Sequence, residues 1–410
     1  MSSLTAIATY GRAGAGARVR LFEWIERLVP DAAVHSYVGT AVNSPKTLLS
    51  RPVATFRAER VLRSLTVRPA ERLFVFRQAS PFGHGGLEAR PLGSADLGVY
   101  DFDDGLPWDG GRRSNPGNLI RSSASKCLQS VRHADRVIAG NDYLAEWSSQ
   151  YARDVVVIPS CVDPQMYRAK DDYEIGDPPR LVWIGSPSSE IYLGVVEPAL
   201  LRLHRQTGAR LTIIGDASCR LEGPLAAMTD RLQWQERQAE QQLGAFDIGL
   251  GPLTDDRFSR GKSAYKLLQY GAAGLPFVAS PVGTNDVVTR ALGGRLATGT
   301  DEWVDQVTDL LRAAPAERRA AGESARDAVV RSYSFDAWSE RWLEALGLLE
   351  RLIEADPYEE HHYLQAAELQ ARSGNRRRAL STLNRAERTL SDLGVVPSRT
   401  FLQVRDALSK

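Results

Sequence analysis

Four basic side chains lie in or just before the segment from residue 258 to residue 288, namely Arg257, Arg260, Lys262 and Lys266. A glycine, an apolar helical pattern and a short apolar strand follow, which predicts a helix that begins near residues 261–263. Unpaired N–H groups and the dipole at a helix N-terminus favour an anion, and lysines there are unfavourable unless an anion is bound. The pattern therefore predicts an anion site. The alternative is a solvated loop whose cations pair with Asp255 and Asp256.

Two stretches of the chain alternate short apolar runs with helical patterns, which predicts a parallel sheet with helical crossovers in each. The runs include "TAIATYG", "RLFVFRQ" and "ADRVIAG" in the first stretch, and "RLVWIGSPS", "ARLTIIGDAS" and "LPFVASPVG" in the second. Ligands of such sheets bind outside the carboxyl ends of the strands. The site candidates are therefore the polar segments that follow strands: residues 11–16, 77–80, 101–104, 185–189, 215–216 and 257–263.

Composition excludes several classes of protein. The chain has 410 residues, of which 43% are hydrophobic and 25% charged, and its net charge is +1, so no bulk field favours nucleic acid. Three separated cysteines indicate neither a disulfide framework nor a zinc site. The N-terminus does not read as a signal peptide and no run is long enough to span a membrane, so a cytoplasmic location is expected.

The chain turns helical from about Ser334. Two amphipathic helices joined by "SGN" are similar to a tetratricopeptide hairpin, and the segment resembles the helical domain of bacterial transcriptional activators. One hairpin cannot bury its apolar face alone. The tail is therefore expected to pack on the second sheet domain, on a second subunit in a homodimer, or on a partner, the first two being favoured.

The segment "FDIGLGPLTDDRFSRGKSAYKLLQYGAAGLPFVASPVG", with "VVVIPSCVDPQMY" and "LVWIGSPSSEIYLGVV", resembles glycosyltransferase family 4, in particular the branch with the motifs W-I-G-S-P and G-K-x-x-x-K-L-L-Q-Y. The resemblance covers about residues 1–346. It implies an α/β protein with the GT-B fold, in which two doubly wound Rossmann-like domains face each other across a cleft, here followed by a helical hairpin tail. It also implies transfer of a sugar, such as a hexose, from a nucleotide-diphosphate sugar to an acceptor hydroxyl or amine, with retention and without a metal or other cofactor.

The resemblance assigns the parts of the chain. Residues 1–168 would form the acceptor domain, 169–333 the nucleotide-sugar domain, 334–348 a linking helix and 349–410 the tail. Donor-binding roles fall on Gly14, Gly16, Ser186, Lys262, Ser263, Lys266 and Gln269. Catalytic roles fall on Asp101 and Asp103, and acceptor-binding roles on Arg77, Gln78 and His84. The acceptor would be a natural product or a cell-envelope glycan.

Two departures from the family pattern keep other functions open. Much of the family carries two glutamates on the donor helix, and Gly261 and Gln269 occupy those positions here. The chain could instead be a GT-B enzyme that does not transfer sugars, such as an epimerase or a pseudo-sugar coupling enzyme, or a non-catalytic regulator that binds nucleotide sugars. For the basic helix with Arg57, Arg60 and Arg63, a solvated face or a patch for a phosphorylated acceptor is favoured over membrane docking.

Overall fold

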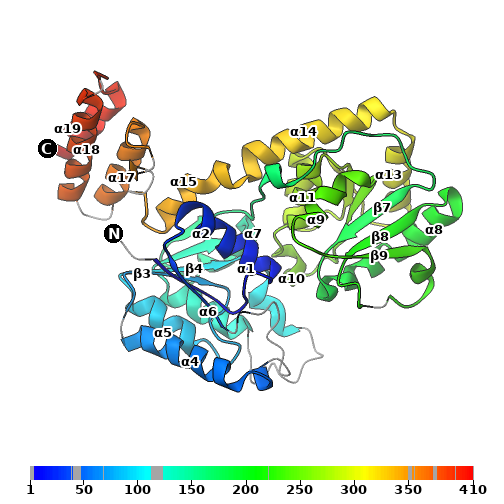
Figure 1. The fold of residues 1–410 in the computed structure, drawn as a ribbon, viewed down its shortest axis with the longest axis horizontal. Helices are drawn as coiled ribbons and strands as arrows, with labels where there is room; N and C mark the ends of the chain where they lie inside the picture. Colours follow the sequence, from blue (N-terminus) through cyan, green and yellow to red (C-terminus); the bar gives the residue numbers. More distant parts are fainter. Residues whose placement is uncertain are drawn as a thin grey trace.

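The computed structural model describes residues 4–37, 39, 48–67, 69–111, 123–219, 221–349, 353–354, 356–372, 376–392 and 394–409. Two six-stranded parallel sheets form its two large lobes, and a group of helices at the C-terminal end lies beside the first lobe (Figure 1). Strand orders are β2-β1-β3-β4-β5-β6 and β12-β11-β10-β7-β8-β9. In each sheet the order reverses near the first strand, which is the point where doubly wound sheets bind ligands.

The first sheet is covered on both faces. Alternate residues of each strand point to opposite faces, so Phe74 packs with the segment around Trp24, whereas Val75 packs with Leu62 and Val131. Its strands are β1 (Leu4–Ala8), β2 (Ala33–Ser36), β3 (Arg72–Phe76), β4 (Leu97–Phe102), β5 (Arg136–Ala139) and β6 (Val155–Val157). Its helical segments are α1 (Ala15–Ala17), a π-helix over Arg18–Phe22, α2 (Glu23–Leu28), α4 (Pro52–Val67), α5 (Gly86–Ser94), α6 (Ser123–His133) and α7 (Asp142–Ser148).

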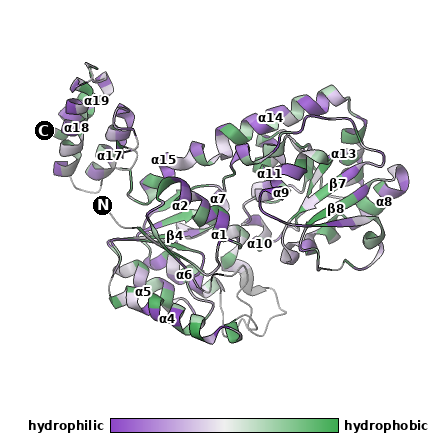
Figure 2. Cartoon of the chain, in the orientation of Figure 1, coloured by the Kyte–Doolittle hydropathy of each residue, from purple (hydrophilic) through white to green (hydrophobic). Residues whose placement is uncertain are grey.

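The second sheet is built in the same way. Leu181 and Trp183 pack with Leu203 and Trp303 on one face, and Val182 packs on the other. Its strands are β7 (Arg180–Ile184), β8 (Arg210–Gly215), β9 (Thr229–Gln233), β10 (Ile248–Gly251), β11 (Phe277–Ala279) and β12 (Arg295–Leu296). Its helices are α8 (Glu197–Thr207), α9 (Gln238–Gln242), α10 (Arg257–Arg260), α11 (Tyr265–Ala273), α12 (Thr284–Ala291), α13 (Thr300–Arg312) and α14 (Pro315–Tyr333). Strands such as β7 and β8 are mainly hydrophobic, while the outer helices carry hydrophilic stripes (Figure 2).

The chain returns to the first lobe after α14. Ser334 ends that helix and caps the next, α15 (Phe335–Ala345), because its hydroxyl accepts a hydrogen bond from the Ala337 N–H at 3.2 Å. The indole of Trp342 stacks on Trp24 of α2 with ring centroids 5.3 Å apart. The burial of these large aromatic rings fixes α15 to the first sheet domain.

The tail continues the same hydrophobic core. It consists of α17 (Glu360–Arg372), α18 (Arg376–Asp392) and α19 (Arg399–Ser409). Tyr363, Leu383 and Phe401 of these helices are buried in one cluster with Trp24 and Trp342. The tail therefore joins the core of the first sheet domain, and not that of the second, where the sequence placed one of its expected partners.

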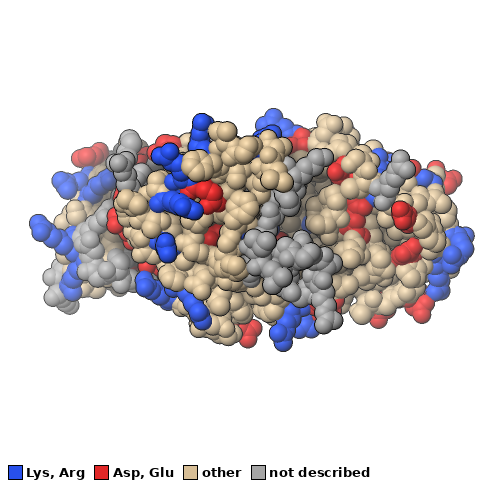
Figure 3. All heavy atoms as spheres, turned by 90° about the horizontal axis from the view of Figure 1, so that it is seen from below, with Lys and Arg blue, Asp and Glu red and all other residues tan. Residues whose placement is uncertain are grey.

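Basic side chains gather over the half of the molecule that holds the first sheet, on the face seen in Figure 3. Arg57, Arg60 and Arg63 of α4 are exposed, as the sequence predicts for a solvated face. Val53 and Phe56 of the same helix are exposed as well, by 69% and 67%. In the described part of the chain, no helix is both long and apolar enough to cross a membrane.

Candidate functional site

A pocket of about 580 Å³ lies between the two sheet domains. Its walls come from segments that follow strands in both sheets, because parallel strands present their carboxyl ends at one edge. From the first domain the described lining includes Gly14, Gly16, Arg18, Arg77, Asp103, Asp104 and Ser160. From the second it includes Ser186, Asp216, Gln233, Trp234, Lys262, Ser263, Tyr265, Lys266 and Gln269. Most of the residues that the sequence singled out thus meet in one cavity.

The donor helix begins later than the sequence predicts. Residues 257–260 form the separate short helix α10, and α11 starts only at Tyr265, preceded by Ala264 in the left-handed region at φ +53°. The turn arises because Asp256 caps α10 by accepting a hydrogen bond from the Ser259 N–H at 2.8 Å. Lys262 and Ser263 therefore lie on a loop before the helix, and only Lys266 lies in its first turn.

The four cations of the opening segment divide into two pairs. Lys262 and Lys266 line the pocket. Arg260 forms an exposed ion pair with Asp255 at 2.6 Å, and Arg257 is exposed. The solvated-loop alternative thus describes the arginines, and the lysines remain the candidates for the predicted anion site.

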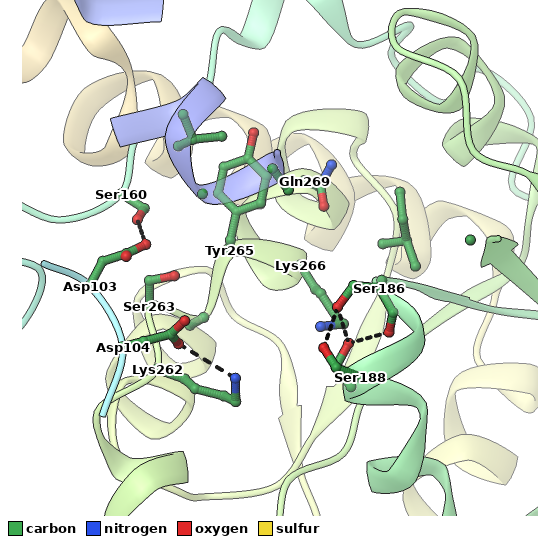
Figure 4. A pocket seen from close by; sticks show the side chains of 18 of the residues that line it. Asp103, Asp104, Ser160, Ser186, Ser188, Lys262, Ser263, Tyr265, Lys266 and Gln269 are labelled. Atoms are coloured by element: carbon green, nitrogen blue, oxygen red, sulfur yellow. Dashed lines mark hydrogen bonds and ion pairs between the residues drawn. The ribbon is translucent and has the colours of Figure 1, made fainter. Parts of the chain in front are cut away.

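Lys266 loses its proton more readily than an ordinary lysine. Burial against the pocket wall lowers the pKa of its ammonium group to about 8, and the nearby charge of Lys262 adds to this effect. The ammonium lies 5.1 Å from the ring centroid of Trp183, an electron-rich face that attracts cations. Ser186 and Ser188, whose hydroxyls are 3.1 Å apart, line the same pocket (Figure 4). An anion placed here would meet a cation and a cluster of hydroxyl groups.

Two carboxylates and an arginine face the lysines from the first domain. Arg77, held at φ +56° just after β3, donates to Asp103 at 2.6 Å and pairs with Asp104 at 2.7 Å. Asp104 reaches across to Lys262, at 3.5 Å. Burial works against the charge of Asp104, but Arg77 and Lys262 together hold the pKa of this carboxyl below its usual value. Asp104 is therefore ionised at neutral pH and sits among cations from both domains.

Asp101 has a different position from the one that the sequence predicts. It is the penultimate residue of β4 and is completely buried, and its carboxylate accepts hydrogen bonds from Arg20 at 3.0 and 2.5 Å. Arg20 also donates to the Ile158 carbonyl at 2.8 Å. The described lining of the pocket does not include Asp101. A direct catalytic role for Asp101 is therefore not supported, because its carboxylate is enclosed by protein and bonded to a buried arginine.

Asp103 does line the pocket, but its oxygens are engaged. One accepts from the Arg77 Nε and Nη2 atoms at 2.9 and 2.6 Å, and the other accepts from the Ser160 hydroxyl at 3.4 Å. The main contact of the Asp103 carboxylate is therefore with Arg77, whose guanidinium group it orients.

The glycine turn after β1 brings backbone close to these charges. A Cβ atom on Gly16 would lie 3.2 Å from the Arg77 guanidinium carbon, and one on Gly14 would lie 2.8 Å from the Tyr10 Cβ. Arg18 follows on the π-helix, where its guanidinium lies 5.4 Å from the Trp234 ring of the second domain. Arg12 bonds to Glu236 at 2.8 Å. The two domains are therefore in direct contact at this end of the pocket.

Two predicted acceptor residues lie outside the described lining of the pocket. Gln78 donates to the Ser123 hydroxyl at 3.0 Å, and His84 is exposed on a loop. Arg77 alone of the predicted acceptor group reaches the cavity. The adjacent chain positions diverge because Arg77, with its positive φ, turns the backbone sharply after the strand.

The two positions that depart from the glutamate pattern also differ in their surroundings. Gln269 is buried at the pocket wall and donates to the Tyr167 hydroxyl at 3.2 Å. Gly261 lies against Gly105 of the first domain, so a Cβ on Gly261 would be 2.7 Å from the Gly105 Cα. There is no space for a side chain at residue 261 in this arrangement.

Sequence reasoning did not anticipate three features of the site: the contact of Arg18 with Trp234, the place of Tyr265 in the lining, and the pairing of Asp104 with Lys262. Asp104 stands in the same acidic run as Asp103, so its place after a strand was a usable signal. The contact of Arg18 with Trp234 had no signal, because it depends on the relative placement of the two domains. Among the described residues, no group of three or more His, Cys, Asp or Glu side chains is arranged to hold a metal ion.

The chain matches two protein families over parts of its length. Residues 178–313 match the family described as Glycosyl transferases group 1, and residues 285–408 match the Bacterial transcriptional activator domain. The second match begins inside α12, although α12 to α14 are part of the second sheet domain. A comparison with curated proteins finds no match.

Solved structures share the architecture at low sequence identity. One is Alr3699/HepE of Anabaena in complex with UDP-glucose, with a TM-score of 0.60 at 15% identity, over 84% of this chain and 99% of that one. Another is WaaG, described as a glycosyltransferase involved in lipopolysaccharide biosynthesis, with a TM-score of 0.58 at 14% identity and the same coverage. The predicted fold class is confirmed. The chain therefore has the GT-B fold, and residues 178–313, most of its second sheet domain, match the family described as Glycosyl transferases group 1.

Proposed function

We propose that this protein is a glycosyltransferase that moves a sugar from a nucleotide-diphosphate sugar to an acceptor hydroxyl or amine. One observation carries the proposal: Lys262, Ser263 and Lys266 of the second domain face the carboxylates and Arg77 of the first across a single pocket. The glycosyl transferases group 1 match covers the loop that carries Lys262 and Ser263, called the lysine loop below. The similar Anabaena structure is described as a complex with UDP-glucose. Both findings support a nucleotide sugar as the ligand.

The chemistry follows from where charge develops. As the bond between sugar and diphosphate breaks, negative charge grows on the leaving phosphate oxygen. The ammonium groups of Lys262 and Lys266 and the Ser263 hydroxyl are in place to bind that charge more strongly than they bind the donor itself, which lowers the barrier. Asp103 contributes by orienting Arg77, which lines the pocket from the first domain and to which the proposal gives an acceptor-binding role. Retention of anomeric configuration and independence of metal ions are part of the proposal, taken from the family resemblance.

A thermal-shift screen against UDP-, GDP-, ADP- and dTDP-sugars tests the first step. We expect at least one of them to raise the melting temperature of the full chain and to fail to do so for Lys262→Ala. Incubation of that donor with candidate natural-product and glycan acceptors should then give a glycoside, detected by mass spectrometry. Absence of a shift with every nucleotide sugar would contradict the proposal.

A second candidate function is a nucleotide-sugar-binding regulator. The match of residues 285–408 to the Bacterial transcriptional activator domain favours it, since that part holds the tail helices α17 to α19. A regulator would show the thermal shift and its loss in Lys262→Ala, but neither transfer nor hydrolysis of the donor. Any measurable turnover that Lys262→Ala abolishes would favour the enzyme.

A further inference from the structure

The loop after β4 in the first domain is pressed against the lysine loop of the second. A Cβ atom on Gly105 would lie 2.5 Å from the Phe258 carbonyl oxygen, so the two backbones touch. The Asn141 side chain fastens the contact, because its Nδ2 donates to the Gly261 carbonyl at 3.0 Å. Its Oδ1 meanwhile caps α7 by accepting from the Leu144 N–H at 3.0 Å. The position of the residue before Gly105, which is Asp104, relative to the lysines is therefore fixed by backbone packing.

This contact places the Asp104 carboxylate beside the Lys262 ammonium group, at the pocket. One oxygen pairs with Arg77 at 2.7 Å, and the other makes a long, weak contact of 3.5 Å with the Lys262 ammonium group. The lysine end of the pocket in Figure 4 thus combines two ammonium groups with one resident negative charge. The Asp103 carboxylate is bonded instead to Arg77 and Ser160, so Asp104 is the residue whose carboxylate pairs with Lys262.

On the basis of the proposed function, we propose that Asp104 makes the pocket discriminate between the intact nucleotide sugar and the free nucleoside diphosphate that remains after transfer. The terminal phosphate of a free nucleoside diphosphate loses a second proton near pH 6, so it carries about one more negative charge at pH 7.5 than the same phosphate bearing a sugar. The lysines attract both ligands. The carboxylate repels the extra charge of the free diphosphate in particular.

The sugar-bearing ligand has a second advantage at the same carboxylate. Its hydroxyl groups are hydrogen-bond donors, and an ionised carboxylate accepts hydrogen bonds at both oxygens. The long contact with Lys262 leaves the Asp104 Oδ1 able to accept one. Residue 261, where much of the resembling family has a glutamate, has no side chain to offer, whereas Asp104 reaches the neighbouring space from the other domain. The carboxylate therefore disfavours the product and can hold the donor.

The test is the ratio of two dissociation constants, for UDP and for UDP-glucose, measured by calorimetry at pH 7.5 and constant salt. In Asp104→Asn we expect UDP to bind more tightly while UDP-glucose binds equally or less tightly, so that the ratio falls roughly tenfold, the scale of one like-charge contact. Asp104→Glu should retain most of the wild-type ratio. Where the wild type binds another base, the matching pair of ADP, GDP or dTDP ligands takes the place of the UDP pair.

The matched control is Asp255→Asn, which removes the same charge from an exposed carboxylate that pairs with Arg260 at 2.6 Å and is not part of the described pocket lining. Its ratio should stay within about twofold of the wild type, because solvent and salt screen an exposed charge outside the pocket. Asp104→Ser is measured in parallel, so that a folding defect in one variant does not decide the outcome.

An unchanged ratio in folded Asp104→Asn or Asp104→Ser, with both ligands still bound, would overturn this inference and leave the proposed function standing. If Asp255→Asn lowers the ratio as far as Asp104→Asn does, this inference is likewise overturned and the proposed function stands. Failure of the wild-type chain to bind any of the four ligand pairs would overturn the proposed function itself, and this inference with it.

Discussion

Two arginine–aspartate pairs in this protein have aspartates that are close together in the sequence, yet the pairs serve opposite purposes. Arg20 and Asp101 are each 1% exposed and are bonded to each other and to backbone. Arg77 and Asp104, whose aspartate stands only three residues further along the chain, are about one-fifth exposed and face the pocket. We call the first pair closed, because Arg20 and Asp101 are bonded to protein groups and neither is part of the described pocket lining. The second is open, because a lysine and a cavity lie beside it.

The two pairs differ because one aspartate lies within a strand and the other lies beyond its end. Asp101 is still within β4, so its side chain points to a face of the sheet that is covered by helices. Asp104 lies beyond the strand, at the edge where the second domain approaches. A shift of three residues thus converts an interior ion pair into one that a ligand can reach.

The largest effect is expected from breaking the closed pair. Asp101→Ala leaves the Arg20 guanidinium buried without its counter-charge, which should reduce the free energy of unfolding by about 3–5 kcal/mol. Urea unfolding of the full chain, followed by fluorescence, measures this. The control is Asp230→Ala, which removes the exposed partner of Arg210 and should cost less than about 1 kcal/mol. Equal losses in the two variants would show that the Arg20 pair is not a closed structural unit.

The next largest effect concerns the open cluster. Lys262→Ala and Lys266→Ala should each weaken the binding of UDP, or of the diphosphate of the preferred base, by about ten- to a hundredfold, because each removes a charge-assisted contact. Arg63→Ala removes an exposed cation from α4 in the first domain and should leave the affinity within about twofold. Equal affinity in all three variants by calorimetry would remove the basis of the site.

The pH dependence of binding gives a smaller and more specific effect. If the diphosphate binds at Lys266, it binds the protonated form, and the pKa of this lysine is lowered to about 8. The protonated fraction falls as pH rises through 8, so the affinity should decrease, by about tenfold between pH 7 and pH 9. Lys266→Ala should remove most of this slope. A slope that is equally steep in the variant would assign the titration to another group.

The smallest expected effect is that of a chelator. If the lysines supply the charge that balances the leaving phosphate, EDTA should change the rate of sugar transfer by less than about twofold. Loss of activity on chelation, with recovery in manganese, would instead give the aspartates at the end of β4 a metal-binding role.

The sequence was sufficient for the fold because the fold depends on local patterns. Alternating apolar runs and helices gave both sheets, and the polar segments after strands gave the lysine loop and the glycine turn. The helix start near residue 261 was wrong, since the capping by Asp256 creates a separate short helix that the apolar pattern did not indicate. Such local hydrogen bonds are decided by competition between side chains and backbone.

The site was less predictable because part of it depends on contacts between distant segments. Asp101, Asp103 and Asp104 are the same residue type in one short run of sequence. Only the position of each relative to β4 distinguishes the buried Asp101 from Asp104, which faces the pocket. Gln78 and His84 follow a strand as Arg77 does, yet the positive φ of Arg77 redirects the chain after it. The residue-specific roles in the pocket, which the variants above test, remain predictions.

The return of the chain after α14 has a mechanical consequence. The outgoing and returning segments pass between the lobes side by side, since the Val162 N–H donates to the Tyr333 carbonyl at 2.9 Å and Val162 pairs with Ser334 in a single bridge. We expect two covalent crossings so close together to act as a hinge, with rotation about them as the easiest motion of one lobe against the other. The contact of Gly105 with Gly261, which lies between the lobes, would then have to separate when the protein opens.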